Sequence, residues 1–94
     1  MKHIFIINPT AGKYDSRQRI YEMAEHLRTA HGLDVQCILT KKQGHATEIA
    51  QKLCQTGEPL RFYACGGDGT MNEVLQAAAG KEQIAVGCIP CGSG

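Results

Sequence analysis

Two kinds of apolar pattern alternate along this 94-residue chain, and their alternation limits the possible folds more than any other feature. Four short, largely apolar segments are typical of buried β-strands, and they cover residues 3–8, 34–40, 60–65 and 84–90. Between them lie three segments whose apolar residues recur at the spacing of an α-helix. This order predicts a parallel sheet whose right-handed crossovers place helices on both faces. The expected fold class is therefore α/β, a Rossmann-like three-layer sandwich with a mainly parallel four-stranded sheet.

Each predicted helix is marked by an apolar stripe and by a residue that ends it. The stripes comprise Ile20, Met23, Ala24 and Leu27; Ala46, Ile49, Ala50, Leu53 and Cys54; and Met71, Val74, Leu75 and Ala78. Asp15, with Gln18 three residues later, is a suitable N-cap for the first helix. Gly32, Gly57 and Gly80 are expected to end the three helices, because glycine readily adopts left-handed backbone angles.

The composition fits one small soluble domain that spans residues 1–94. Hydrophobic residues make up 43% of the chain and charged residues 20%, as in ordinary globular proteins. The net charge is only +1, which argues against a nucleic-acid-binding surface, and the pair Lys41–Lys42 is interpreted as solvated. No segment approaches the roughly 20 apolar residues needed to cross a membrane, and the start lacks the apolar region of a secretory signal. A cytoplasmic location is the expectation.

The five cysteines do not indicate a disulfide framework, because their number is odd and their spacing fits no such scaffold. Cys37, Cys54 and Cys65 lie in apolar segments, so buried reduced thiols are expected. Cys88 and Cys91 form a C-x-x-C pair, but a thiol redox module needs a helix N-terminus beside the first thiol. A zinc site needs about four ligands, and the histidines are scattered. Redox and metal functions are therefore disfavoured, and no metal-ligating residue is predicted.

Glycine-containing turns follow three of the predicted strands. They read NPTAGK at residues 8–13, GGDGT at 66–70 and PCGSG at 90–94. In open α/β sheets, ligands bind beyond the carboxyl ends of the strands. Glycine permits positive φ angles and close approach of a ligand to the main chain, and the start of a helix attracts anions. Glycine in one such turn could serve geometry alone, but three turns on one edge favour a phosphate site, and they should then share one cleft.

Two familiar phosphate-binding motifs are excluded by spacing. A Walker A loop would need glycine in place of Ile7 and Ser or Thr in place of Tyr14. A dinucleotide-binding fingerprint would need glycine where Asn72 stands. The sequence therefore predicts a phosphate site of another kind.

The residues after the second glycine turn allow more than one interpretation. Thr70 and Glu73 precede an apolar stripe with the spacing of a capping box, which predicts that they cap the third helix. Asp68 is the candidate catalytic residue, because a carboxylate beside phosphates opposes their charge unless it accepts a proton or holds magnesium. A turn-forming aspartate that bonds its own backbone remains the alternative.

The segments NPTAGK, GGDGTMNEV and PCGSG, in this order, resemble the diacylglycerol kinase catalytic-domain family. That family includes bacterial lipid kinases, sphingosine kinases and ceramide kinases, with NAD kinases as more distant relatives. The resemblance implies ATP-dependent phosphorylation of a lipid hydroxyl, with ATP and Mg²⁺ as cofactors. The positions that match the family's nucleotide site are Asn8, Gly12, Thr40, Gly66, Gly67, Asp68, Gly69, Thr70, Met71, Asn72 and Ser93. Ser93 stands where relatives usually have threonine, a change that keeps the hydroxyl.

The resemblance also implies that such kinases continue into a β-rich domain that carries much of the lipid pocket. Residues 1–94 are therefore expected to be the amino-terminal ATP-binding part, inactive alone, with unpaired edge strands that invite self-association. The full-length enzyme would contact the inner membrane face peripherally. An NAD kinase-like enzyme and a non-catalytic nucleotide-binding domain remain alternatives, and the lipid is not identified by the sequence.

Overall fold

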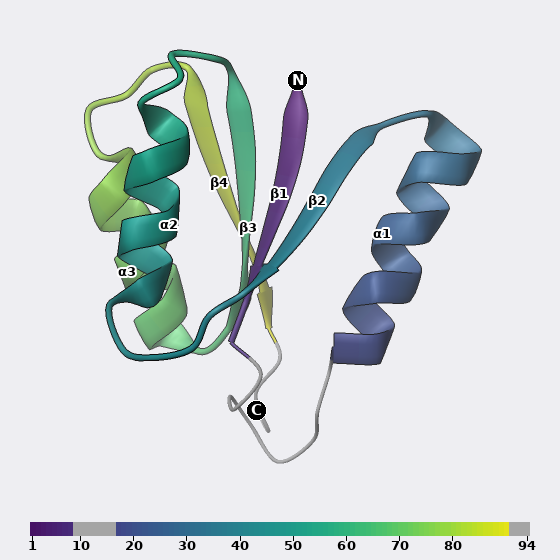
Figure 1. Ribbon diagram of the computed structural model, residues 1–94, viewed down its shortest axis with the longest axis horizontal. Coiled ribbons are helices and arrows are strands. Elements are labelled where there is room, and N and C mark those ends of the chain that lie inside the picture. The colour runs from purple at the N-terminus through teal and green to yellow at the C-terminus, as the bar shows by residue number, and fades with distance from the viewer. Residues whose placement is uncertain (9–16, 91–94) are drawn as a thin grey trace.

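The computed structural model describes residues 1–8 and 17–90, and these form a four-stranded sheet with three helices (Figure 1). The elements are β1 (Lys2–Ile7), α1 (Arg17–His31), β2 (Asp34–Leu39), α2 (His45–Cys54), β3 (Leu60–Gly66), α3 (Asp68–Ala78) and β4 (Ile84–Pro90). All three strand pairs are parallel, and the strand order is β2-β1-β3-β4. The predicted α/β class and parallel sheet are confirmed, and each strand boundary lies within one residue of its prediction.

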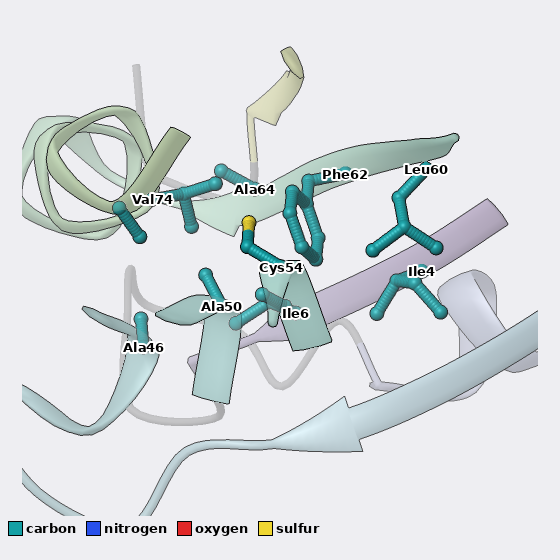
Figure 2. Close-up of a cluster of buried hydrophobic side chains, with 10 residues drawn as sticks. Ile4, Ile6, Ala46, Ala50, Cys54, Leu60, Phe62, Ala64 and Val74 are labelled. Atoms are coloured by element: carbon teal, nitrogen blue, oxygen red, sulfur yellow. The ribbon is translucent and has the colours of Figure 1, made fainter. Parts of the chain in front are cut away.

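The sheet separates two apolar layers, as alternation along β1 requires. Ile4 and Ile6 pack with residues of α2 and α3, and Phe5 and Ile7 pack with residues of α1. Figure 1 shows α1 on the opposite face of the sheet from α2 and α3. Figure 2 shows side chains of the first layer, where Phe62 is fully buried. The first layer comprises Ile4, Ile6, Ala46, Ala50, Cys54, Leu60, Phe62, Ala64, Val74 and Ala77. The predicted three-layer arrangement is thus confirmed.

The first helix ends as its glycine predicts. Gly32 has a φ of +65°, its N–H donates to the carbonyl of Arg28 at 3.1 Å, and the N–H of Leu33 donates to the carbonyl of Leu27 at 3.2 Å. This pair of bonds is a Schellman motif, which satisfies the last carbonyls of a helix. Gly57 and Gly80 also have positive φ angles, 75° and 76°. The proposed cap Asp15 lies outside the described residues.

The outer edge of β2 is covered by a side chain of α1. The Arg28 guanidinium donates to the Val35 carbonyl from Nε at 3.1 Å and from Nη2 at 2.8 Å. Because β2 has a strand neighbour on one side only, the carbonyls on its other side have no strand to bond. Arg28 therefore supplies a hydrogen-bond partner that the edge strand otherwise lacks.

Candidate functional site

The carboxyl ends of three strands are joined by main-chain hydrogen bonds at one edge of the sheet. The N–H of Asn8 donates to the carbonyl of Cys65 at 2.9 Å, and the N–H of Thr40 donates to the carbonyl of Ile7 at 2.8 Å. The buried Thr40 hydroxyl also donates to Ile7, at 3.4 Å. Asn8 and Thr40 are thereby fixed to the rigid edge where ligands bind in folds of this kind.

A pocket of about 380 Å³ opens at this edge, between the first turns of α2 and α3. Its lining comes from the residues that directly follow β1 and β2, from both helices and from the turn between β2 and α2. The lining residues are Asn8, Thr40, Lys41, Lys42, Gln43, Ala46, Gly69, Thr70 and Glu73. Asn8, Thr40, Gly69 and Thr70 were predicted nucleotide-site residues, so the fold brings these four together in one cleft.

Gly66 is required by close packing at the end of β3. A Cβ added there would lie 2.7 Å from Thr70 Oγ1 and 3.3 Å from Asn8 Cβ. Any side chain at Gly66 would push the first turn of α3 away from the strand end. Of the two properties of glycine considered above, positive φ angles do not explain this cluster, because the positive-φ glycines among the described residues are Gly32, Gly44, Gly57 and Gly80.

The main chain is accessible at Gly67 and Gly69. A Cβ added at either position would meet no atom within 4 Å. Gly67 is the N-cap of α3, and its carbonyl accepts the bond from the N–H of Met71 at 3.3 Å. The amides of Asp68, Gly69 and Thr70 precede that first helical donor, and the N-cap offers them no side-chain hydrogen bond. Such amides are suitable donors to an anion.

The predicted capping box of Thr70 and Glu73 is wrong. The helix begins at Asp68, so Thr70 is its third residue, and the N-cap is Gly67. The Thr70 side chain is buried beneath the strand end, and Glu73 lines the pocket. The Glu73 carbonyl accepts a hydrogen bond from Thr47 Oγ1 at 2.9 Å, which ties α3 to the first turn of α2.

The remaining predicted residues lie around the pocket or outside it. Asp68 is exposed at the first position of α3, where a negative charge is favourable to the helix dipole. Asn72 is exposed on the same helix. The Met71 side chain packs against the apolar layer between the sheet and the helices, so it does not line the pocket. Gly12 and Ser93 fall outside the described residues.

The sequence interpretation missed the basic rim of the pocket. Lys41 and Lys42 line it, although they had been interpreted as an ordinary solvated pair. The signal was available, because both lysines directly follow a predicted strand and therefore lie at the carboxyl edge of the sheet. The two lysine charges and the two helix N-termini outweigh the Glu73 carboxylate. The pocket therefore suits an anion with several charges.

The cysteines do not form a second site within the part of the chain that is described. Cys54 and Cys65 are buried, as predicted, and Cys37 is half-buried. Burial raises the pKa of the Cys37 and Cys54 thiols, which disfavours the reactive thiolate. Cys88 is exposed on β4, and its predicted partner lies outside the described residues. Within residues 1–8 and 17–90, no three His, Cys, Asp or Glu side chains are grouped to hold a metal ion.

Comparison with known proteins relates residues 2–94 to the family described as the diacylglycerol kinase catalytic domain. The chain is 38% identical over 90 residues to a diacylglycerol kinase of Staphylococcus saprophyticus, covering 94% of this chain and 28% of that protein. It is 30% identical over 102 residues to sphingoid long-chain bases kinase 1 of Arabidopsis thaliana, covering 98% of this chain and 13% of that protein.

A solved structure gives the same relationship. The crystal structure of a diacylglycerol kinase from Bacillus anthracis superposes with a TM-score of 0.72 at 29% identity. The match covers 97% of this chain and 33% of that one. The chain thus spans a third or less of the length of these relatives. None of the described helices is long and apolar enough to cross a membrane.

Proposed function

Because the chain belongs to the diacylglycerol kinase catalytic-domain family, we propose that it forms the ATP-binding part of a kinase that phosphorylates a lipid hydroxyl. The pocket between the first turns of α2 and α3 is the observation that supports this proposal most directly. Its volume lies within the range of small-molecule sites. Each helix N-terminus contributes roughly half a positive charge, to which Lys41 and Lys42 add two full charges. Polyphosphate is the chemical group that such a site fits.

The residues of the pocket divide into groups with different roles in this proposal. The amides of Gly69 and Thr70 donate to phosphate oxygens, and the two lysines neutralise phosphate charge. Gly66 keeps the strand end close to α3, so these donors hold their positions. Asn8 and Thr40 form the floor at the strand ends.

The proposed reaction is transfer of the γ-phosphoryl group of ATP. The lipid hydroxyl oxygen forms a bond to the γ-phosphorus, and the bond from that phosphorus to the β–γ bridging oxygen breaks. ADP leaves, and the hydroxyl proton passes to a base. Asp68 is the proposed catalytic residue, because it is exposed and directly precedes Gly69, which lines the pocket. The Asp68 carboxylate also suits Mg²⁺, which binds through carboxylates and phosphate oxygens and neutralises phosphate charge when bound.

Lipid binding is proposed to require surface beyond this pocket. The pocket is lined mainly by polar and charged residues, whereas an acyl chain needs apolar contacts. We therefore expect the 94-residue chain alone to show no lipid phosphorylation, and the full-length kinase to meet its lipid as a peripheral protein at the inner membrane face. ATP-dependent phosphorylation of diacylglycerol or a sphingoid base by the purified chain would contradict this expectation.

Titration of the chain with ATP–Mg²⁺, followed by amide chemical shifts, tests the nucleotide site. We expect changes confined to residues 8–13, 40–42 and 66–72. The double variant Lys41→Gln/Lys42→Gln should raise the Kd roughly tenfold, the size expected for lost charge-assisted hydrogen bonds. The matched control Lys52→Gln/Lys81→Gln removes the same charge away from the pocket and should leave the Kd nearly unchanged.

The outcome of that titration distinguishes the proposed site from its alternatives. If both double variants raise the Kd for ATP–Mg²⁺ equally, the overall charge of the chain, and not the pocket, attracts the nucleotide. Shift changes elsewhere on the sheet would exclude the pocket as the site. Tighter binding of NAD than of ATP would favour an NAD kinase-like enzyme.

The proposed catalytic role of Asp68 must be tested in the full-length kinase. Asp68→Asn keeps the size of the side chain but removes its charge and most of its basicity. We expect turnover to fall by about 10²-fold or more while ATP binding persists, since general-base catalysis supplies about that factor. Unchanged turnover in the Asp68→Asn enzyme would eliminate this residue as catalytic.

A further inference from the structure

The turn between β2 and α2, here called the lysine turn (residues 41–44), is held at both of its ends. Thr40 precedes it and is bonded to the carbonyl of Ile7 through its amide and its hydroxyl. His45 follows it and begins α2. Gly44 has a φ of +83°, which lets the chain reverse between these two anchors. Lys41 and Lys42 line the pocket from this short, anchored turn.

His45 makes two hydrogen bonds to the lysine turn. Its ring Nδ1 accepts from the N–H of Lys41 at 2.8 Å, and its own N–H donates to the carbonyl of Lys42 at 3.2 Å. Because Nδ1 accepts, the ring proton resides on Nε2, so the ring takes part as the neutral imidazole. Together, the two bonds hold the N–H of Lys41 and the carbonyl of Lys42, so both lysines are fixed to His45 through their main chain.

The ion pair of the lysine turn is weaker than these hydrogen bonds. Lys42 Nζ lies 3.7 Å from Glu48 Oε1, and both side chains are more than 60% exposed. An exposed ion pair of this kind contributes little to holding a turn. The ring of His45 therefore carries a large part of the local constraint on Lys41.

We propose that His45 is a positioning residue for the phosphate pocket, acting through the lysine turn and not through contact with the ligand. The inference rests on the proposed function, since it assumes that Lys41 and Lys42 bind phosphate. His45 itself does not line the pocket. Its imidazole holds the main chain of Lys41, so both lysine side chains leave the turn in the direction of the anion.

Three substitutions at His45 separate the acceptor from the rest of the ring. His45→Ala removes the acceptor. His45→Asn places its amide oxygen near the position of Nδ1 and restores an acceptor, whereas His45→Gln places its amide one bond further out. We expect His45→Ala to raise the Kd for ATP–Mg²⁺ and for inorganic triphosphate about three- to tenfold, the range for one lost hydrogen bond. His45→Asn should recover most of the affinity, and His45→Gln should not.

Two further measurements exclude a general effect on folding. Hydrogen exchange at the Lys41 amide should accelerate in His45→Ala and His45→Gln but not in His45→Asn, with or without ligand. In the Lys41→Gln/Lys42→Gln background, His45→Ala should have almost no additional effect on the Kd, because the lysines through which it acts are gone. His26→Ala, on the exposed surface of α1, is the matched control and should change neither quantity.

The outcomes are distinguishable. If the wild-type chain binds neither ATP–Mg²⁺ nor triphosphate, the proposed function fails and the role of His45 fails with it. If the wild type binds but His45→Ala binds equally well, only the inference about His45 is overturned. If His45→Ala raises the Kd as much in the Lys41→Gln/Lys42→Gln background as in the wild type, the inference is also overturned. Should His45→Ala not fold, the comparison of His45→Asn with His45→Gln decides the question.

Discussion

Gly66 ends β3 and Gly69 is the second residue of α3, yet the structure gives these two nearby glycines opposite surroundings. At Gly66 the neighbouring Thr70 and Asn8 leave no room for a Cβ, whereas at Gly69 a Cβ would meet no atom within 4 Å. Neither glycine has a positive φ angle. The first glycine therefore serves packing within the protein, and the second keeps the main chain accessible at the pocket.

This difference predicts different effects of the same substitution. Gly66→Ala should lower the free energy of unfolding by about 1–3 kcal/mol, because the first turn of α3 must shift. Gly69→Ala should leave stability unchanged or slightly raised, since alanine favours a helix, while it weakens phosphate binding by obstructing the amides. Urea denaturation and the Kd for ATP–Mg²⁺ measure the two effects. Wild-type stability in Gly66→Ala would show that the strand end has room to relax.

Among the elements, the strands and helices themselves were predictable, but the start of α3 was not. Short apolar segments and helical spacing place all seven elements, because a strand covered on both faces is apolar throughout and a helix buries one stripe. Thr70 and Glu73 have the spacing of a capping box, but β3 extends to Gly66 and a single residue separates it from α3. The helix therefore begins three residues before the first apolar residue of its stripe, Met71, where the sequence carries no periodic signal.

The edge strand β2 gives a prediction at the scale of one element. Arg28→Ala removes two donors from the Val35 carbonyl and should lower the free energy of unfolding by about 1 kcal/mol. Arg28→Lys should recover only part of this, because an ammonium cannot reproduce the two-donor geometry of the guanidinium. Arg19→Ala, on an exposed part of α1, is the control. Urea denaturation measures all three, and equal stability of Arg28→Ala and wild type would contradict the prediction.

Across the whole molecule, one physical rule made part of the site predictable. The strands of a parallel sheet end at the same edge, so the glycine turns that contain Asn8 and Gly69 were expected to lie near one another, whereas Thr40 was expected only from the family resemblance. Gln43 was missed as a pocket residue because a polar side chain in a turn is usually solvated. Glu73 was missed because its spacing from Thr70 predicted a helix cap. Only the three-dimensional arrangement of α2 beside α3 shows that these side chains border a common space.

The opposite end of the sheet gives a prediction about the stability of the whole fold. His3 Nδ1 lies 2.9 Å from the Tyr63 hydroxyl, and burial, followed by the charges of Arg61 and the N-terminus, lowers the pKa of His3 below its ordinary value of 6.5. The folded state therefore binds fewer protons than the unfolded state just below pH 6.5. The stability contribution of neutral His3 is complete above that pH and is lost as the pH falls through the folded pKa.

Unfolding in urea at pH 7.5 and at pH 5 measures this loss. We expect the wild type to lose more stability on acidification than His3→Gln, which does not titrate. The control Tyr63→Phe keeps the histidine and should retain most of the pH dependence. An identical pH dependence in wild type and His3→Gln would show that other groups are responsible.

The hydrogen bond from the Thr47 hydroxyl to the Glu73 carbonyl links α2 and α3, the two helices that border the pocket. Each of them meets the pocket with its first turn, and α1, on the far side of the sheet, contributes no lining residue from the described part of the chain (Figure 1). Strain applied by a ligand to one helix would therefore be passed to the other within the same layer. Substitutions in the opposite layer should affect folding but not the pocket. Natural sequences should therefore vary more in α1 than in α2 and α3.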